Sequence, residues 1–265
     1  MGILSNDIQF HIKTSSTQIG KYVLLPGDPG RVPLIASKLT KAARVSQNRE
    51  YNVYSGFLGS EKVSVCSTGI GGPSAAIAVE ELIKCGAHTF IRVGTSGGMD
   101  LKVMGGDLVV AQAAIRGDGT SREYLTPDYP AVANYMVTKA LVEEAEALSL
   151  DTDGNRFHVG VVQSKDSFYG EVEPETMPVG DFLEKRWDSY LKSGCLVSEM
   201  EAATIFSVAL TRRVRAGAVL LALWNVERSK AGLPDTVTED TERAVMCAFG
   251  AVKRLIAADK ADKLI

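Results

Sequence analysis

Cysteine and histidine are scarce and scattered in this sequence of 265 residues. The cysteines form no C-x-x-C pair and lie in apolar surroundings, so we expect buried thiols and no disulfide framework. The histidines have no spacing typical of metal ligands, which argues against a zinc site. The residues concerned are Cys66, Cys85, Cys195, Cys247, His11, His88 and His158.

An excess of one charge and long apolar runs are also missing. The 29 basic and 32 acidic residues give a net charge of -3, so no protein-wide field attracts nucleic acid or an anionic membrane, and we expect neither as a partner. The longest apolar run, 216–224, is far shorter than the roughly 18 residues that span a bilayer, and it predicts a buried strand. Residues 1–10 lack a basic segment followed by an apolar stretch, so we expect a cytoplasmic protein.

Short apolar runs alternate with longer amphipathic stretches along the chain. This alternation predicts a layered α/β fold with a largely parallel sheet, in a single domain over residues 1–265. We expect strands at 22–25, 63–67, 89–94, 107–111, 158–163 and 216–224. We expect helices at 29–39, 73–85, 131–148, 182–192, 199–212 and 245–256, and a long loop at 170–180.

Glycine is in mild surplus, with 25 residues, and glycines gather at three expected strand ends. The three segments are 25–31 (LPGDPGR), 67–74 (STGIGGPS) and 92–98 (RVGTSGG). In α/β folds ligands bind beyond the carboxyl ends of the strands, and glycine lets backbone amides approach an anion there. Each loop alone is equally typical of a tight turn, and none fits a dinucleotide or P-loop signature. Together they favour one shared site.

Arginines accompany these loops. Arg31 follows the first, Arg92 lies in the expected strand before the third, and Arg49 stands in a polar segment between them. A buried guanidinium needs a partner, so Arg92 alone leaves open a phosphate or carboxylate ligand and a structural salt bridge. Its convergence with other arginines and a Thr-Ser pair on glycine loops favours the anionic ligand.

Two carboxylates and an aromatic residue complete the chemical inventory. Glu199 and Glu201 flank Met200 at the expected start of a helix, where they are typical of helix-dipole stabilisation or of binding to a sugar diol. Phe168 belongs to a polar segment and offers a face on which a base can stack.

Five motifs in this order resemble the nucleoside phosphorylase-I family, and within it the bacterial uridine phosphorylases. They are PGDPGR (26–31), NREY (48–51), CSTGIGGPS (66–74), IRVGTSG (91–97) and SEMEAA (198–203). The resemblance implies a three-layer α/β/α fold with a central mixed, largely parallel sheet. It also implies a pentosyltransferase that cleaves uridine reversibly with phosphate, giving uracil and ribose 1-phosphate.

The resemblance also implies site residues. Phosphate would be bound by Gly27, Arg31, Arg92 and Thr95, and by Arg49 of a neighbouring subunit. Ribose would be bound by Met200 and Glu201 with Glu199 nearby, and by His11 from across a dimer interface. Arg92, Thr95 and Glu201 would be the catalytic residues. Fixed donors suit this role, because phosphate must be held beside a sugar ring that gains positive charge.

Further implications concern assembly and ions. Contributions from two subunits make a dimer the smallest active unit, and related bacterial enzymes are hexamers. Glu50, Ile70 and Ser74 match positions that hold a monovalent cation, such as K⁺, between subunits of some relatives. We expect no other cofactor, because phosphate is a co-substrate, and only small molecules as further partners.

Recognition of the base is where the sequence departs from the family. The glutamine and arginine that contact uracil are absent, since their positions fall on Val172 and Pro174 or on Glu171 and Thr176. We expect the base to be bound by Phe168, Glu171, Thr176, Gly97 and Asn225. Asn225 cannot protonate a leaving purine, which favours a pyrimidine. A phosphorylase for inosine or cytidine, a hydrolytic nucleosidase and a nucleoside-binding protein without turnover remain alternatives.

Overall fold

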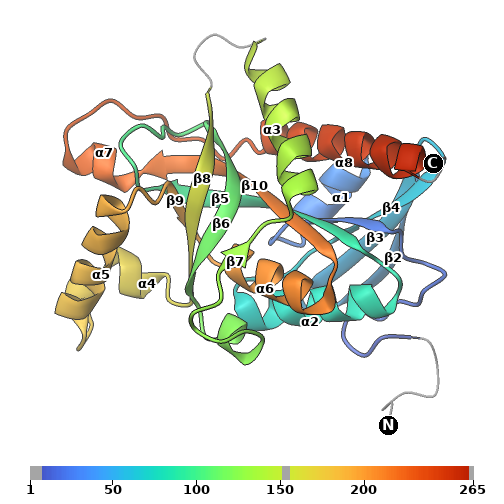
Figure 1. Cartoon of the computed structure of the whole chain (residues 1–265), viewed down its shortest axis with the longest axis horizontal. Helices are drawn as coiled ribbons and strands as arrows, with labels where there is room; N and C mark the ends of the chain where they lie inside the picture. The colour runs from blue at the N-terminus through green and yellow to red at the C-terminus, as the bar shows by residue number, and fades with distance from the viewer. Residues whose placement is uncertain (1–7, 151–155, 263–265) are drawn as a thin grey trace.

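The computed structural model describes residues 8–150 and 156–262, and Figure 1 shows a mixed sheet with helices packed on both sides. The predicted α/β class is confirmed. The strands are β1 (Tyr22–Leu25), β2 (Thr40–Asn48), β3 (Tyr51–Leu58), β4 (Glu61–Cys66), β5 (Thr89–Gly98), β6 (Leu108–Gly117), β7 (Ala131–Val132), β8 (Phe157–Lys165), β9 (Val197–Glu199) and β10 (Arg215–Asn225). The helices are α1 (Arg31–Ala36), α2 (Gly72–Lys84), α3 (Tyr135–Leu150), α4 (Tyr169–Val172), α5 (Gly180–Lys192), α6 (Ala202–Arg212), α7 (Val226–Lys230) and α8 (Glu242–Asp262), with 3-10 turns η1 (Thr120–Glu123) and η2 (Pro174–Thr176).

The strand order is β10-β6-β8-β9-β5-β1-β4-β3-β2. Parallel pairings join β1 to β4 and β5, β5 to β10, and β8 to β6 and β9. Antiparallel pairings make up the β2–β3–β4 edge and join β5 to β9 and β6 to β7 and β10. Because β10 pairs with both β5 and β6, strands β5, β9, β8, β6 and β10 form a closed ring at one end of the sheet. The largely parallel character predicted from sequence therefore holds only for the central strands.

Two hydrophobic cores cover the two faces of the sheet. Side chains alternate along β1, so that Val23 and Leu25 pack in the core with α2 and α6, and Tyr22 and Leu24 in the core with α1, α3 and α8. Strands buried on both faces carry continuous apolar runs, which is why β1, β5 and β10 could be predicted from sequence.

Three expected elements differ in the structure. The helix predicted at 199–212 begins at Ala202, because Val197–Glu199 pairs with β5 and β8 as a strand. The loop predicted at 170–180 contains α4 and η2, and the helix predicted at 131–148 begins at Tyr135 after the short strand β7. All four cysteines are buried thiols, as predicted. Within residues 8–150 and 156–262, no helix has the length and apolar character needed to cross a membrane.

Candidate active site

A cavity of about 1100 Å³ opens at the carboxyl ends of the central strands. The segments that follow β1 and β4 line it through Gly27 and Gly69, and β5 lines it through Gly97. The three glycine loops that were expected to share one site therefore line one cavity. Residues from β8, β9, α4 and α5 close the opposite end of the cavity.

Two arginine side chains meet at Gly27. A Cβ placed on Gly27 would lie 4.0 Å from both Arg31 Nη2 and Arg92 Nη1. Arg31 Nη1 and Arg92 Nη1 are buried and have no hydrogen-bond partner among the described residues. Burial lowers the pKa of Arg31 and the neighbouring charge of Arg92 lowers it further, while the charges of Asp28 and Glu201 oppose this fall. Thr95 lines the same cavity. This corner therefore suits a phosphate-sized anion.

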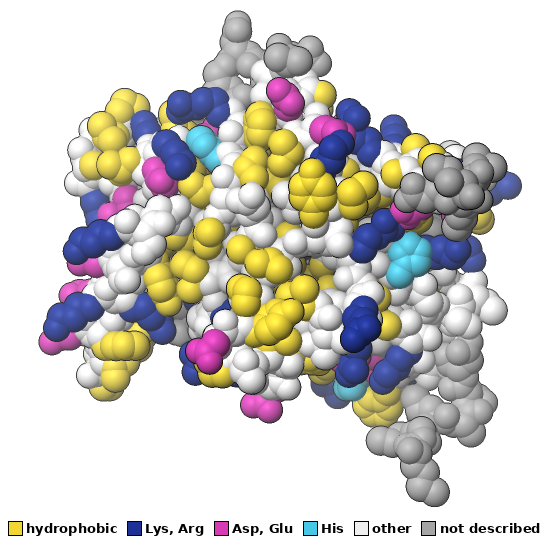
Figure 2. Space-filling model, in the orientation of Figure 1, with side chains coloured by type: hydrophobic (Ala, Val, Ile, Leu, Met, Phe, Trp, Pro, Cys, Tyr) yellow, Lys and Arg dark blue, Asp and Glu magenta, His cyan; other side chains and the backbone are white. Residues whose placement is uncertain are grey.

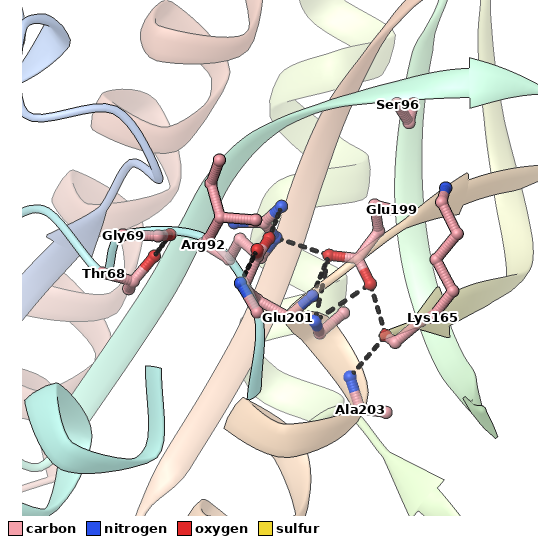
Figure 3. Close-up of polar contacts among 12 residues, drawn as sticks. Thr68, Gly69, Arg92, Ser96, Lys165, Glu199, Glu201 and Ala203 are labelled. Atoms are coloured by element: carbon pink, nitrogen blue, oxygen red, sulfur yellow. Dashed lines mark hydrogen bonds and ion pairs between the residues drawn. The ribbon is translucent and has the colours of Figure 1, made fainter. Parts of the chain in front are cut away.

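Arg92 is held by the carboxylates of Glu199 and Glu201, which Figure 3 shows beside its guanidinium group. Its Nε donates to Glu199 Oε2 at 2.7 Å, and its Nη2 pairs with Glu201 Oε2. Burial acts to lower the pKa of Arg92, but the charges of Glu201 and Glu199 outweigh this effect and raise it. The structural salt bridge predicted for this buried arginine is therefore confirmed for Nε and Nη2, and Nη1 has no partner among the described residues.

Glu199 ends β9 and is fully committed to protein contacts. It accepts hydrogen bonds from Arg92 Nε, from the Ser164 hydroxyl, and from the backbone N–H groups of Glu201 at 2.9 Å and Ala202 at 3.0 Å. These four donors occupy its two oxygens, which fixes Arg92 and the first turn of α6. Glu199 therefore positions Arg92 and α6, and its place in the cavity lining near the expected ribose site stays a prediction.

Glu201 lies one residue before α6, next to the corner of the cavity where Arg31 and Arg92 meet. Its Oε1 accepts the backbone N–H of Gly71 at 2.5 Å, and its Oε2 pairs with Arg92. Burial raises the pKa of the Glu201 carboxyl, while the charge of Arg92 opposes that rise. Met200 and Glu201 both line the cavity. A buried carboxylate beside the anion corner can accept hydrogen bonds from hydroxyl groups of a bound sugar.

The other end of the cavity carries part of the predicted base-binding set. Phe168 is 43% exposed, and it lines the cavity with Glu171 and Gly97. Thr176 does not belong to this lining: it is exposed in η2, and its hydroxyl donates to the carbonyl of Glu173 at 2.8 Å. The prediction for Thr176 is wrong, because the expected loop winds into a short helical turn that points this side chain outward.

Asn225 is also wrongly predicted as a base contact. Its Oδ1 accepts the N–H groups of Glu227 and Arg228 and thus caps α7, while its Nδ2 donates to the carbonyls of Asp100 and Val103 at 2.8 Å. The side chain is fully buried, with its oxygen on the start of α7 and its nitrogen on the segment that follows β5. Sequence position placed it beside the site, but local capping orients it away.

Replacing Asn225 by alanine is expected to cost stability and to leave substrate choice unchanged. The variant loses a helix cap and two buried donors, so we expect a loss of about 1–3 kcal/mol in the free energy of unfolding. Urea unfolding measures this change, and the ratio of rates on different nucleosides serves as control. A changed ratio at unchanged stability would show that Asn225 does contact the base.

The residues predicted to act between subunits lie at the surface or at the rim. The His11 ring and backbone contact Glu81, with Nδ1 2.7 Å from Oε1, and Arg49 is exposed in the turn between β2 and β3 at φ +53°. Glu50 and Ile70 line the cavity, and Ser74 donates to the Ile70 carbonyl at 3.2 Å. Their roles toward a neighbouring subunit stay predictions.

Sequence reasoning missed three polar residues of the cavity, Gln163, Lys165 and Ser198. The signal was present, because Gln163 and Lys165 stand two residues apart at the polar end of an otherwise apolar strand. Such side chains point to the same face of a strand. All three lie at the end of the cavity away from Gly27, with Phe168 and Glu171.

Comparison with known proteins places this geometry in context. Residues 21–257 match the family model described as "Phosphorylase superfamily". A protein named "Uridine phosphorylase" from Treponema pallidum is 49% identical over 97% of this chain and 98% of its own length. Another "Uridine phosphorylase", from Thermococcus kodakarensis, is 44% identical over 80% of this chain and 76% of its own length. A "Guanosine phosphorylase" from Halorubrum lacusprofundi is 37% identical over 93% and 99%.

Proposed function

Because the chain belongs to the phosphorylase superfamily, we propose that it is a uridine phosphorylase, which cleaves uridine with phosphate to uracil and ribose 1-phosphate. The observation that carries this proposal is the arginine pair beside Gly27, in which Arg31 Nη1 and Arg92 Nη1 are buried without a hydrogen-bond partner among the described residues. An anion would satisfy these donors, and phosphate is the anion that the reaction consumes. A hydrolase that used water would have no need of such a clamp.

The site geometry supports a simple course for the reaction. Arg31, Arg92 and Thr95 hold phosphate, while Glu201 and the Met200 backbone hold the ribose. A phosphate oxygen forms a bond to the anomeric carbon as the glycosidic C–N bond breaks, and the base departs with the electron pair. The sugar gains positive charge during this step, and the adjacent phosphate and Glu201 stabilise it.

The proposal is tested by measuring base release from uridine, thymidine, cytidine, inosine and adenosine, with and without phosphate. We expect uridine to be cleaved fastest, and only with phosphate. Equal release without phosphate would establish a hydrolase, and no release from any nucleoside would favour a binding protein. The similarity to a protein named "Guanosine phosphorylase" supports a purine nucleoside phosphorylase as second candidate. Inosine cleaved far faster than uridine would establish it.

Replacing Gly27 by alanine is expected to block phosphate and spare the fold. The added Cβ would meet the Gly69 carbonyl oxygen at 3.5 Å and the two guanidinium groups at 4.0 Å, which are ordinary contacts, but it would occupy the anion corner. We expect the KM for phosphate to rise about 100-fold, as when a ligand loses its charged contacts. Kinetics at varied phosphate and a thermal melt test this, and an unchanged KM would place phosphate elsewhere.

We infer a three-layer fold in one domain over residues 1–265, and a cytoplasmic enzyme. We also infer a dimer in which His11 and Arg49 of each subunit reach the active site of the other, and a hexamer built from such dimers. Figure 2 supports association, because hydrophobic side chains gather over β7 and β8, where Val132, Val159 and Val161 are exposed. We also propose, from the resemblance, that Glu50, Ile70 and Ser74 hold a monovalent cation; two of these residues are already in contact, since Ser74 Oγ donates to the Ile70 carbonyl at 3.2 Å.

A further inference from the structure

A buried ion pair stands at the end of the cavity away from Gly27. Lys165 Nζ lies 2.8 Å from Glu171 Oε1, and their side chains are 8% and 15% exposed. Ser198 completes a ring, because its hydroxyl accepts from Lys165 Nζ at 2.7 Å and donates to Glu171 Oε2 at 2.8 Å. Removing two charges from water costs about as much as their attraction returns, so stability alone gives no reason for such a pair.

The pair faces the ligand space. Ser164 points toward α6, where its hydroxyl accepts the Ala203 N–H at 2.8 Å. Successive side chains of a strand alternate, so Gln163 and Lys165 point to the opposite face, and both line the cavity. Figure 3 shows the Lys165 chain extending away from Ala203, with its ammonium at the far end. Gln163 Oε1 is buried on that same face without a hydrogen-bond partner among the described residues.

We propose that Lys165 and Glu171 together read the base of the nucleoside, an inference that rests on the proposed function. Lys165 has three N–H groups, and its contacts to Glu171 and Ser198 use two of them. The third donates to a base carbonyl, and the Glu171 carboxylate accepts the neighbouring ring N–H. Ser198 holds the two groups side by side through its contacts to both. Gln163 offers a further acceptor on the same face. Phe168, beside them in the cavity, supplies the stacking surface.

This arrangement defines a class of base. It fits a ring that presents an N–H next to a carbonyl, as uracil, thymine, hypoxanthine and guanine do. Cytosine and adenine present a bare nitrogen and an amino group at these positions, so a lone pair would face the carboxylate and N–H groups would face the ammonium. Such mismatches of buried polar groups discriminate by orders of magnitude. The pair thus supplies the donor and acceptor that the missing glutamine and arginine would have supplied.

The test is a double variant that removes both charges at once, Lys165→Met with Glu171→Leu, so that neither is left buried alone. Its substrates are uridine, 3-methyluridine, which has no ring N–H, and cytidine. We expect kcat/KM for uridine to fall about 100-fold or more, and the wild-type preference for uridine over the other two to shrink to within about tenfold. The control is Lys139→Met with Glu143→Leu, an exposed ion pair on α3 that should change nothing.

A purely structural role would lower all three rates by one factor, and that outcome overturns the inference while the proposed function stands. Binding of uracil, 3-methyluracil and cytosine, measured by calorimetry, separates the two proposals. If uridine is not cleaved but uracil binds selectively and the double variant loses that selectivity, the inference holds and the proposed function fails. If the wild type binds 3-methyluracil or cytosine as tightly as uracil, the inference is overturned.

Discussion

Replacing Arg92 by methionine is expected to abolish the proposed phosphorolysis and to destabilise the fold at the same time. Arg92 offers Nη1 to phosphate, and loss of a single donor to a developing charge lowers rates about 10²–10³-fold. The variant also strands the buried carboxylates of Glu199 and Glu201, and breaking a buried pair from one side costs about 3–5 kcal/mol.

Arg31→Met is the matched control, because it separates the two effects. Arg31 reaches the same corner, but its carboxylate contact is weak, at 3.9 Å from an exposed Asp28. We therefore expect a higher KM for phosphate and an unchanged melting temperature. Kinetics at varied phosphate and urea unfolding of both variants provide the measurements. An Arg92→Met protein with wild-type stability and wild-type phosphate saturation would show that Arg92 does not bind phosphate.

The exchange of Glu201 for glutamine is expected to have the second largest effect. The amide keeps an oxygen for the Gly71 N–H, but it carries no charge for the ribose hydroxyls or for the sugar as it becomes positive. Charge-assisted hydrogen bonds are about twice as strong as neutral ones, and we expect kcat/KM for the nucleoside to fall about 10²–10³-fold. Because burial raises the pKa of Glu201, its ionised form carries a cost at neutral pH that the amide avoids. The variant also takes the Glu201 charge away from Arg92, but Arg92 keeps Glu199 as a partner, so we expect it to lose less stability than Arg92→Met.

The pH profile gives an independent check on Glu201. In the proposed role Glu201 acts as an ionised carboxylate, and the raised pKa means that this form is lost at a higher pH than for an ordinary glutamate. Wild-type kcat/KM should fall on acidification with a limb that the Glu201→Gln variant lacks. Identical limbs in both proteins would assign the titration to another group and would count against Glu201 as the ribose acceptor.

The sequence predicted those parts of the molecule that depend on burial. The runs of β1, β5 and β10 are apolar because both faces of the sheet are covered, and an arginine inside such a run had to have a partner. The hairpin of β2 and β3 was missed, since β2 is a polar, largely exposed edge strand without a helix or strand periodicity of its own. The closed ring depends on pairings between distant strands, which no local pattern encodes.

The site was predicted where glycine and charge coincide and was missed where local hydrogen bonds decide orientation. Gly27 and Arg31 follow one strand, and Arg92 lies in the next strand of the sheet, so topology brings them together. Thr176 and Asn225 lie near the site in sequence, but a 3-10 turn and a helix cap direct them elsewhere. Lys165 was overlooked because its pairing with Glu171 could not be foreseen. Glu171 lies in α4, a segment that was expected as a loop.

The corner around Gly27 has one more consequence, which concerns its balance of charge. The guanidinium groups of Arg31 and Arg92 are offset by the carboxylates of Glu199 and Glu201, so these four side chains together are neutral. A phosphate dianion that binds there makes the corner negative. In the proposed reaction the corner therefore gains the net negative charge that favours a cationic sugar when the nucleophile binds. Nucleoside bound without phosphate would meet a weaker field, which protects it from wasteful attack by water.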